Sequence, residues 1–145
     1  MRYQVLLSYN GANYAGWQIQ PRVLSIQKIL QDILSTMHHH PVMIVGSGRT
    51  DAGVHALGQS FHFDSEMKLN PTEWEKALNA QLPDDIVVRK VRGVPETFHA
   101  RFSALSKRYD YLVNTGAYDP FRYQLEYQLN RRLDIEAMCA SAALF

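Results

Sequence analysis

In four short stretches the apolar residues either alternate with polar ones or form a continuous run, and both patterns predict β-strands. Alternation of apolar and polar side chains is typical of a strand with one covered face, whereas a short apolar run is typical of an interior strand. The alternating stretches are 3–9 and 59–65, and the apolar runs are 42–47 and 86–91. A turn signal, Asn10-Gly11, ends the first of these strands.

Three other stretches carry apolar residues at helical spacing and begin with a residue suited to an N-cap. Ser25 precedes the first helix and Asp134 precedes the third. Asn70 precedes the second, with Glu73 in the capping-box position and Pro71 at the first helical position. The predicted helices cover residues 26–37 and 71–78, and a third begins at residue 135 and is still running at residue 145.

The predicted order through residue 91 is βαββαβ, which indicates an α+β, ferredoxin-like (RRM-like) two-layer sandwich. In this fold two helices cover one face of an antiparallel sheet. The alternation over residues 108–114 predicts an extra strand that extends the sheet. We therefore expect one domain over residues 1–115, and a connecting segment with the start of a truncated helix over 116–145.

The loop after the second predicted strand carries three glycines around an acid, at Gly46, Gly48, Gly53 and Asp51. Glycine permits tight turns and close approach to a ligand, so the loop is suited to present a carboxylate. A dinucleotide-binding fingerprint needs glycine where Asp51 stands, and a phosphate-binding loop counted from Gly48 needs Lys-Ser/Thr after Gly53. Neither is present, so we do not expect this loop to cradle a nucleotide phosphate.

A lone aspartate in such a loop can act as a nucleophile or a general base if it stays ionised. Arg49, two residues before Asp51, is the cation that favours the ionised form. The alternative is that Asp51 only hydrogen-bonds the turn, as aspartate commonly does. The residues alone leave both interpretations open.

The composition is that of an ordinary globular domain: 145 residues, 46% hydrophobic and 20% charged, with a formal net charge of +1. Basic residues are nevertheless grouped within 89–92, 101–108 and 131–132. A local basic surface is therefore an alternative to simple solvated charges. The single cysteine excludes an intrachain disulfide, and adjacent histidines at 38–40 without other dense ligands predict no metal site. With no apolar run of membrane-span length, we expect a cytoplasmic protein that does not contact membranes.

The loop Gly48–His55 (Gly-Arg-Thr-Asp-Ala-Gly-Val-His) resembles, without a break, the hallmark of the tRNA pseudouridine synthase A family. Further segments similar to that family occur in the same order. They are Tyr9–Gly11, Tyr14–Gln18, Leu82–Ile86, Phe98–Ser103 and Lys107–Tyr111. The resemblance covers the chain from Arg2 to about Tyr111.

The resemblance implies an enzyme that isomerises uridine to pseudouridine in tRNA without a cofactor. It implies that Asp51 is the catalytic aspartate, that Tyr109 packs on the flipped base and that Arg49 supports the site. Arg101, Lys107 and Arg108 are candidates for contacts with RNA phosphates, which add affinity without sequence choice.

Members of the family are homodimers that modify the anticodon arm of tRNA, so the resemblance implies tRNA positions 38, 39 and/or 40. They are also nearly twice as long as this chain, with an active-site cleft between two similarly folded halves. We therefore expect the chain to be the N-terminal half, with the C-terminal half absent. Whether this half is active alone is left open.

Two other classes of function compete with this interpretation. A non-catalytic RNA-binding module can have the same βαββαβ order, but residues 60–64 do not fit its aromatic signature. An enzyme for small molecules could use Asp51 as a base, although no metal or nucleotide motif supports it.

Overall fold

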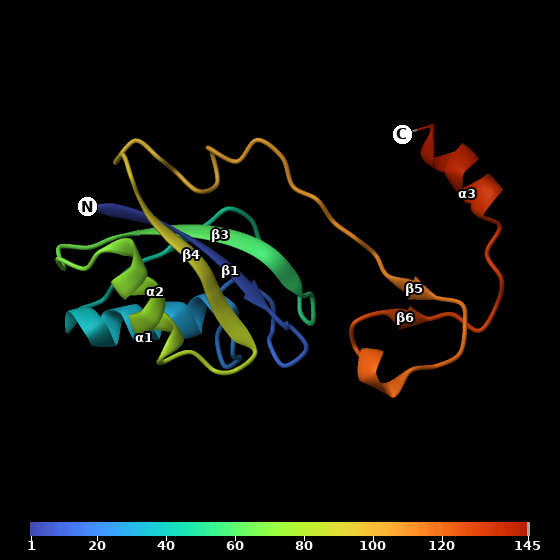
Figure 1. Ribbon diagram of the computed structural model, residues 1–145, viewed down its shortest axis with the longest axis horizontal. Coiled ribbons are helices and arrows are strands. Elements are labelled where there is room, and N and C mark those ends of the chain that lie inside the picture. The colour runs from blue at the N-terminus through green and yellow to red at the C-terminus, as the bar shows by residue number, and fades with distance from the viewer. Residues whose placement is uncertain (145) are drawn as a thin grey trace. The chain divides into compact units, whose positions relative to one another are not determined.

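The computed structural model describes residues 1–144, and Phe145 lies outside the described residues. The chain forms two compact units, Met1–Lys107 and the residues from Arg108 onward. Figure 1 shows the order of helices and strands along the chain.

The first unit is built on a four-stranded sheet with the strand order β2-β3-β1-β4, and every neighbouring pair is antiparallel. This result confirms the α+β class. The central pair keeps one register from Arg2 opposite Asp64 to Leu7 opposite Gln59, and the register shifts before Tyr9 pairs with Ala56. The strands are β1 (Arg2–Tyr9), β2 (Val45–Gly46), β3 (Ala56–Asp64) and β4 (Ile86–Val94).

β2 is shorter than the predicted strand over residues 42–47, because only two residues pair with β3. Val42 and Ile44 are buried as the apolar run predicts. Their backbone N–H groups, however, donate to the side-chain oxygens of Ser35 and Gln31, at 2.9 and 3.4 Å. The preceding helix therefore supplies hydrogen bonds that a neighbouring strand would otherwise supply.

Both predicted helices of this unit form, α1 (Ile26–His38) and α2 (Pro71–Asn79). Ser25 and Asn70 are their N-caps, and the Asn70 and Glu73 side chains form the predicted capping box. Each cap satisfies backbone N–H groups that have no partner inside the helix, which contributes about 1 kcal/mol. The cap residues therefore fix where the two helices begin.

The core lies between the helices and one face of the sheet. Figure 1 shows α1 and α2 on the same side of the sheet, with the segment after β4 on the other side. Full burial of each large apolar side chain contributes about 2 kcal/mol. The buried residues include Val5 and Leu7 of β1, Leu30 and Leu34 of α1, Trp74 and Leu78 of α2, and Phe61 and Phe63 of β3.

α2 is fastened to β4 at an irregularity in the strand. Leu6 pairs with Lys90 but Leu7 pairs with Val88, so Arg89 is an extra residue on β4. Asn79, the last residue of α2, hydrogen-bonds both the N–H and the C=O of Val88, at 2.8 and 2.9 Å. This side chain supplies partners for backbone groups beside the bulge.

The second unit contains short elements only: β5 (Val113–Asn114), a 3-10 turn η1 (Pro120–Arg122), β6 (Tyr127–Gln128) and α3 (Ile135–Ala142). Asp134 caps α3 as predicted. The prediction that residues 108–114 extend the main sheet is wrong, because β5 pairs with β6 in a separate two-stranded parallel sheet. Alternation indicates an extended backbone, but a strand also needs a pairing partner, and here β6 supplies it for two residues.

Candidate active-site loop and basic cavity

The carboxylate-bearing loop connects β2 to β3 and places Asp51 at an exposed turn. The backbone N–H of Val54 donates to the carbonyl oxygen of Asp51 at 3.2 Å, which closes the turn. Gly53 has a φ of +79°, a conformation that side chains rarely adopt. The glycine pattern therefore predicted the turn correctly, and the Asp51 carboxylate is open to a ligand from solvent.

A second loop, residues 10–17, holds the Asp51 loop in place. The N–H of Trp17 donates to the carbonyl of Thr50 at 3.0 Å, and the N–H of Gly53 donates to the carbonyl of Tyr14 at 3.2 Å. The hydroxyls of Tyr9 and Thr50 are 2.8 Å apart and hydrogen-bonded. Backbone bonds on both sides of Asp51 thus fix the direction of its turn.

Two glycines of the second loop allow this close packing. A Cβ at Gly11 would lie 2.0 Å from the carbonyl oxygen of Val54, and one at Gly16 would lie 2.4 Å from that of Thr50. The Gly11 N–H donates to Nδ1 of His55 at 3.0 Å. His55 is therefore a hydrogen-bonding partner of the supporting loop.

A buried glutamine that sequence analysis missed holds the entry to the Asp51 loop. Gln59 accepts from the Ser47 hydroxyl at 2.8 Å and donates to the carbonyl of Gly48 at 2.9 Å. It lies on β3 and is almost fully buried. Its signal in the sequence is a polar residue in register with the inward-facing Phe61 and Phe63.

Tyr14 links the supporting loop to the turn before β4. Its hydroxyl donates to Oδ1 of Asp85, and the backbone carbonyl of Asp85 accepts from the N–H of Asn10 at 2.9 Å. Burial, followed by the hydrogen bond to Asp85, raises the pKa of Tyr14. The phenol therefore stays protonated and continues to donate to Asp85 at neutral and mildly basic pH.

A cavity of about 340 Å³ lies beside the Asp51 loop and carries three cationic side chains. Arg49 comes from the loop itself, and Arg101 and Lys107 come from the segment after β4. Among residues 1–144, none of those that line the cavity is acidic, and Asp51 is not a lining residue. The other lining residues are Trp17, Gln18, Gln27, Ile44, Val45, Gly46 and Gly48. This basic cavity is suited to an anion.

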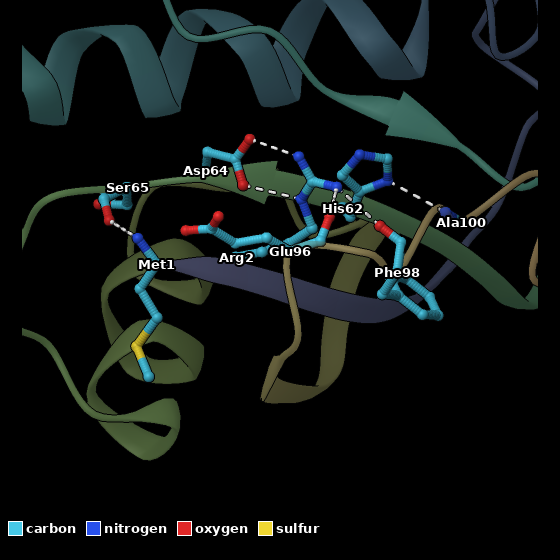
Figure 2. Close-up of polar contacts among 8 residues, drawn as sticks. All are labelled: Met1, Arg2, His62, Asp64, Ser65, Glu96, Phe98 and Ala100. Carbon is cyan, nitrogen blue, oxygen red and sulfur yellow. Dashed lines mark hydrogen bonds and ion pairs between the residues drawn. The ribbon is translucent and has the colours of Figure 1, made fainter.

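The segment that carries Arg101 is tied to the sheet face opposite the helices. Arg2 of β1 forms a two-fold ion pair with Asp64 of β3, with both N–O distances at 2.8 Å. The same guanidinium donates to the carbonyl of Phe98 at 2.8 Å, as Figure 2 shows. Arg2 thus fastens the backbone three residues before Arg101.

The two remaining predicted site residues belong to the second unit. Arg108 pairs with Asp110 at 2.8 Å, and both side chains are exposed. Tyr109 is 73% exposed and lies outside regular secondary structure. The structure therefore brings together Arg49, Arg101 and Lys107, while the roles of Tyr109 and Arg108 stay predictions.

Within the described residues, no cluster of three or more histidine, cysteine, aspartate or glutamate side chains has an arrangement that could bind a metal ion. No helix in the described part of the chain has the length and apolar character needed to span a membrane.

Comparison with known proteins gives a consistent family match. Residues 6–103 match the profile of the family described as tRNA pseudouridine synthase. The chain is 44% identical to tRNA pseudouridine synthase A of an Exiguobacterium species over 94% of its own length and 55% of the relative's. It is 47% identical to that of a Geobacillus species over 94% of this chain and 56% of the relative. It is 42% identical to that of Staphylococcus epidermidis over 100% and 55%. The chain thus spans about half the length of the curated relatives it matches.

Proposed function

The chain belongs to the tRNA pseudouridine synthase family, and we propose that it is the aspartate-bearing half of an enzyme that converts uridine to pseudouridine in tRNA. The observation that carries the proposal is the Asp51 turn held beside a cavity whose described lining has three cations and no acid. The positive charge of the cavity suits a negatively charged RNA strand. The exposed Asp51 carboxylate lies in the same loop as Arg49, one of the three cations.

The reaction breaks the bond from C1′ to N1 of the uracil and forms a bond from C1′ to C5. C5 loses its proton and N1 gains one, so the product is an isomer of the substrate. An anionic oxygen near the sugar is required, and no redox step or group donor is needed. Asp51 supplies that oxygen, either as a nucleophile on the nucleotide or as the base that permits a glycal-type intermediate. Its position at an exposed turn supports both routes equally.

Arg49, Arg101 and Lys107 bind phosphates of the tRNA strand around the reacting nucleotide. Arg49 additionally supports the site as a cation in the same loop as Asp51. Arg108 adds a phosphate contact, and Tyr109 stacks on the flipped base, which is worth about 1–3 kcal/mol. The exposure of Tyr109 leaves its ring free to do so.

The strand order β2-β3-β1-β4 supports a ferredoxin-like architecture. The proposed domain covers residues 1–115, and residues 116–145 lead into a second half. The second half completes the active-site cleft, as in the two-half pseudouridine synthase fold. The complete enzyme is a cytoplasmic homodimer that modifies the anticodon arm of tRNA at positions 38, 39 and/or 40. Recognition rests on tRNA shape more than on base identity, which suits enzymes that serve several positions.

The experiment is tritium release from a tRNA transcript labelled at C5 of uridine. It is run with this chain and with a form extended through the second half of the family. We expect release by the extended form and complete loss in Asp51→Asn, with tRNA affinity largely kept, because one carboxylate contributes chemistry rather than phosphate contacts. Asp32→Asn, on the exposed face of α1 beside Lys28, is the matched control and keeps full activity.

Two results would contradict the proposal. Equal release by Asp51→Asn would show that Asp51 is not catalytic. Absence of release from every form, with tRNA binding intact, would favour a non-catalytic RNA-binding module.

A further inference from the structure

Figure 2 shows a clasp between the open sheet face and the segment that carries Arg101. The clasp consists of Arg2, His62 and Asp64 on the sheet side, and of the backbone of Glu96, Phe98 and Ala100 on the segment side. Arg2 fastens the segment before Arg101 through two backbone carbonyls. A second contact, made by His62, fastens the residue immediately before Arg101.

His62 lies on β3 and is only 5% exposed. Its Nδ1 accepts the backbone N–H of Ala100 at 3.1 Å, and Ala100 is buried as well. A ring nitrogen can accept a hydrogen bond only while it carries no proton. The clasp therefore exists in this form only when His62 is neutral.

A hydrogen-bonded turn that contains Arg101 links the His62 contact to the basic cavity. The N–H of Ser103 donates to the carbonyl of His99 at 2.7 Å, and the N–H of His99 donates to the Ser103 hydroxyl at 3.1 Å. Arg101 thus sits inside a closed five-residue turn whose second residue is held by His62. Its side chain lines the cavity with Arg49 and Lys107.

We propose that His62 is a positioning residue that holds Arg101 at the basic cavity by accepting the Ala100 N–H, and that protonation of His62 releases this turn and weakens RNA binding. The RNA part of the proposal rests on the function proposed above. The release of the turn stands on the geometry alone.

The groups facing His62 keep it neutral at physiological pH. Burial, then the positive charge of Arg2 and then His99, lower the pKa of His62, whereas Asp64 opposes them. The His99 ring lies 5.0 Å from the His62 ring and Phe98 lies 6.1 Å from it, so the site is closed by aromatic rings. Protonation at Nδ1 would set one N–H against another and break the bond to Ala100.

The sign of the pH effect is set by proton linkage. The unfolded chain binds a proton at the ordinary histidine pKa of 6.5, and the folded chain binds it only at lower pH. The stabilising effect of neutral His62 is therefore complete above pH 6.5 and is lost as the pH falls from there through the lowered pKa.

The first test measures hydrogen exchange at the Ala100 amide, expressed as a ratio to exchange at the Leu30 amide in the core of α1. The ratio cancels the intrinsic pH dependence of exchange, and the protection of Leu30 on its own reports any change in global stability. In the unchanged protein we expect the relative protection of Ala100 to fall about tenfold between about pH 7 and pH 5. In His62→Asn the side-chain oxygen replaces Nδ1 as acceptor without titrating, so protection stays constant with pH.

The second test measures affinity for a tRNA transcript over the same pH range. The unchanged protein should bind about three- to fivefold more weakly at the acidic end, which is the order of one phosphate contact. His62→Asn should bind equally at both ends, and His62→Leu, which has no acceptor, should bind weakly at both. His40→Asn, at an exposed histidine after α1, is the control and behaves like the unchanged protein.

The outcomes separate the two proposals. Equal pH dependence of Ala100 exchange in the unchanged protein and in His62→Asn overturns the clasp. A clasp that opens with acid while RNA affinity stays constant overturns the positioning role of His62. Absence of tRNA binding at every pH refutes the proposed function, and Ala100 exchange still decides whether the clasp exists.

Discussion

Gly16 and Gly53 have nearly the same backbone angle, with φ of +82° and +79°, in opposite surroundings. A Cβ at Gly16 would lie 2.4 Å from the Thr50 carbonyl oxygen, whereas a Cβ at Gly53 would meet no described atom within 4 Å. Alanine at Gly53 therefore adds only backbone strain, about 1–3 kcal/mol. Alanine at Gly16 adds the same strain and also pushes the two loops apart.

We expect Gly16→Ala to lower the free energy of unfolding by at least about 2 kcal/mol more than Gly53→Ala, an overlap cost of the size that overpacking produces. Urea denaturation of the two variants measures this difference. Because Gly16 abuts the backbone of Thr50 and Asp51, Gly16→Ala should also reduce tritium release more than Gly53→Ala does. Equal losses of stability would mean that the two loops separate without cost.

The sequence predicted some of these site residues and not others. Glycine spacing was enough to predict an exposed turn at Asp51, because a turn is a local property. The close approach of Gly11 and Gly16 was not predictable, because it depends on residues about 40 positions away in the chain. The buried role of Gln59 was missed because its partners, Ser47 and Gly48, lie on the far side of the loop, 12 and 11 positions away, and alternation does not reveal them.

α2 and β4 depend on a side chain that neither helical spacing nor alternation reveals. Asn79 supplies both hydrogen bonds to the backbone of Val88, which is buried beside the β4 bulge. We expect Asn79→Ala to lower the free energy of unfolding by about 2 kcal/mol, because it leaves a buried N–H and C=O without partners. Gln81→Ala, which removes one exposed hydrogen bond to Ala77, is the matched control and should cost under about 0.5 kcal/mol.

Urea denaturation measures both variants, and equal effects would show that water replaces Asn79 at Val88.

At the scale of elements, the helices were predictable because their caps are local, as Ser25, Asn70 and Asp134 show. The strands were less predictable, because their limits depend on backbone partners. β2 begins late, because Ser35 and Gln31 of α1 accept from the N–H groups of Val42 and Ile44 in place of a strand, and β5 pairs only where β6 lies beside it.

The two units differ in how much of their surface is buried. From residue 108 to 144 no side chain is fully buried, and large aromatic residues such as Tyr111 and Phe121 are 85% and 92% exposed. Burial of apolar surface is the main stabilising term in folding, so the second unit has little to hold it together. The stability of the described chain is therefore expected to reside in Met1–Lys107.

Shortening the chain tests this expectation. A chain of residues 1–107 should keep the urea midpoint of the longer chain, because the four-stranded sheet, both large helices and the clasp at Arg2 and His62 all lie within it.

A chain ending at residue 94 keeps every strand of the main sheet but removes the clasped segment. We expect it to unfold at a clearly lower urea concentration, because Arg2 and His62 then face the sheet surface without their backbone partners. Amides of residues 108–144 should exchange within seconds to minutes in the full chain while core amides of α1 stay protected, as local unfolding of weakly packed segments requires. A lower midpoint for residues 1–107 would show instead that the second unit contributes to the stability of the first, and that the sheet depends on more of the chain than its own contacts indicate.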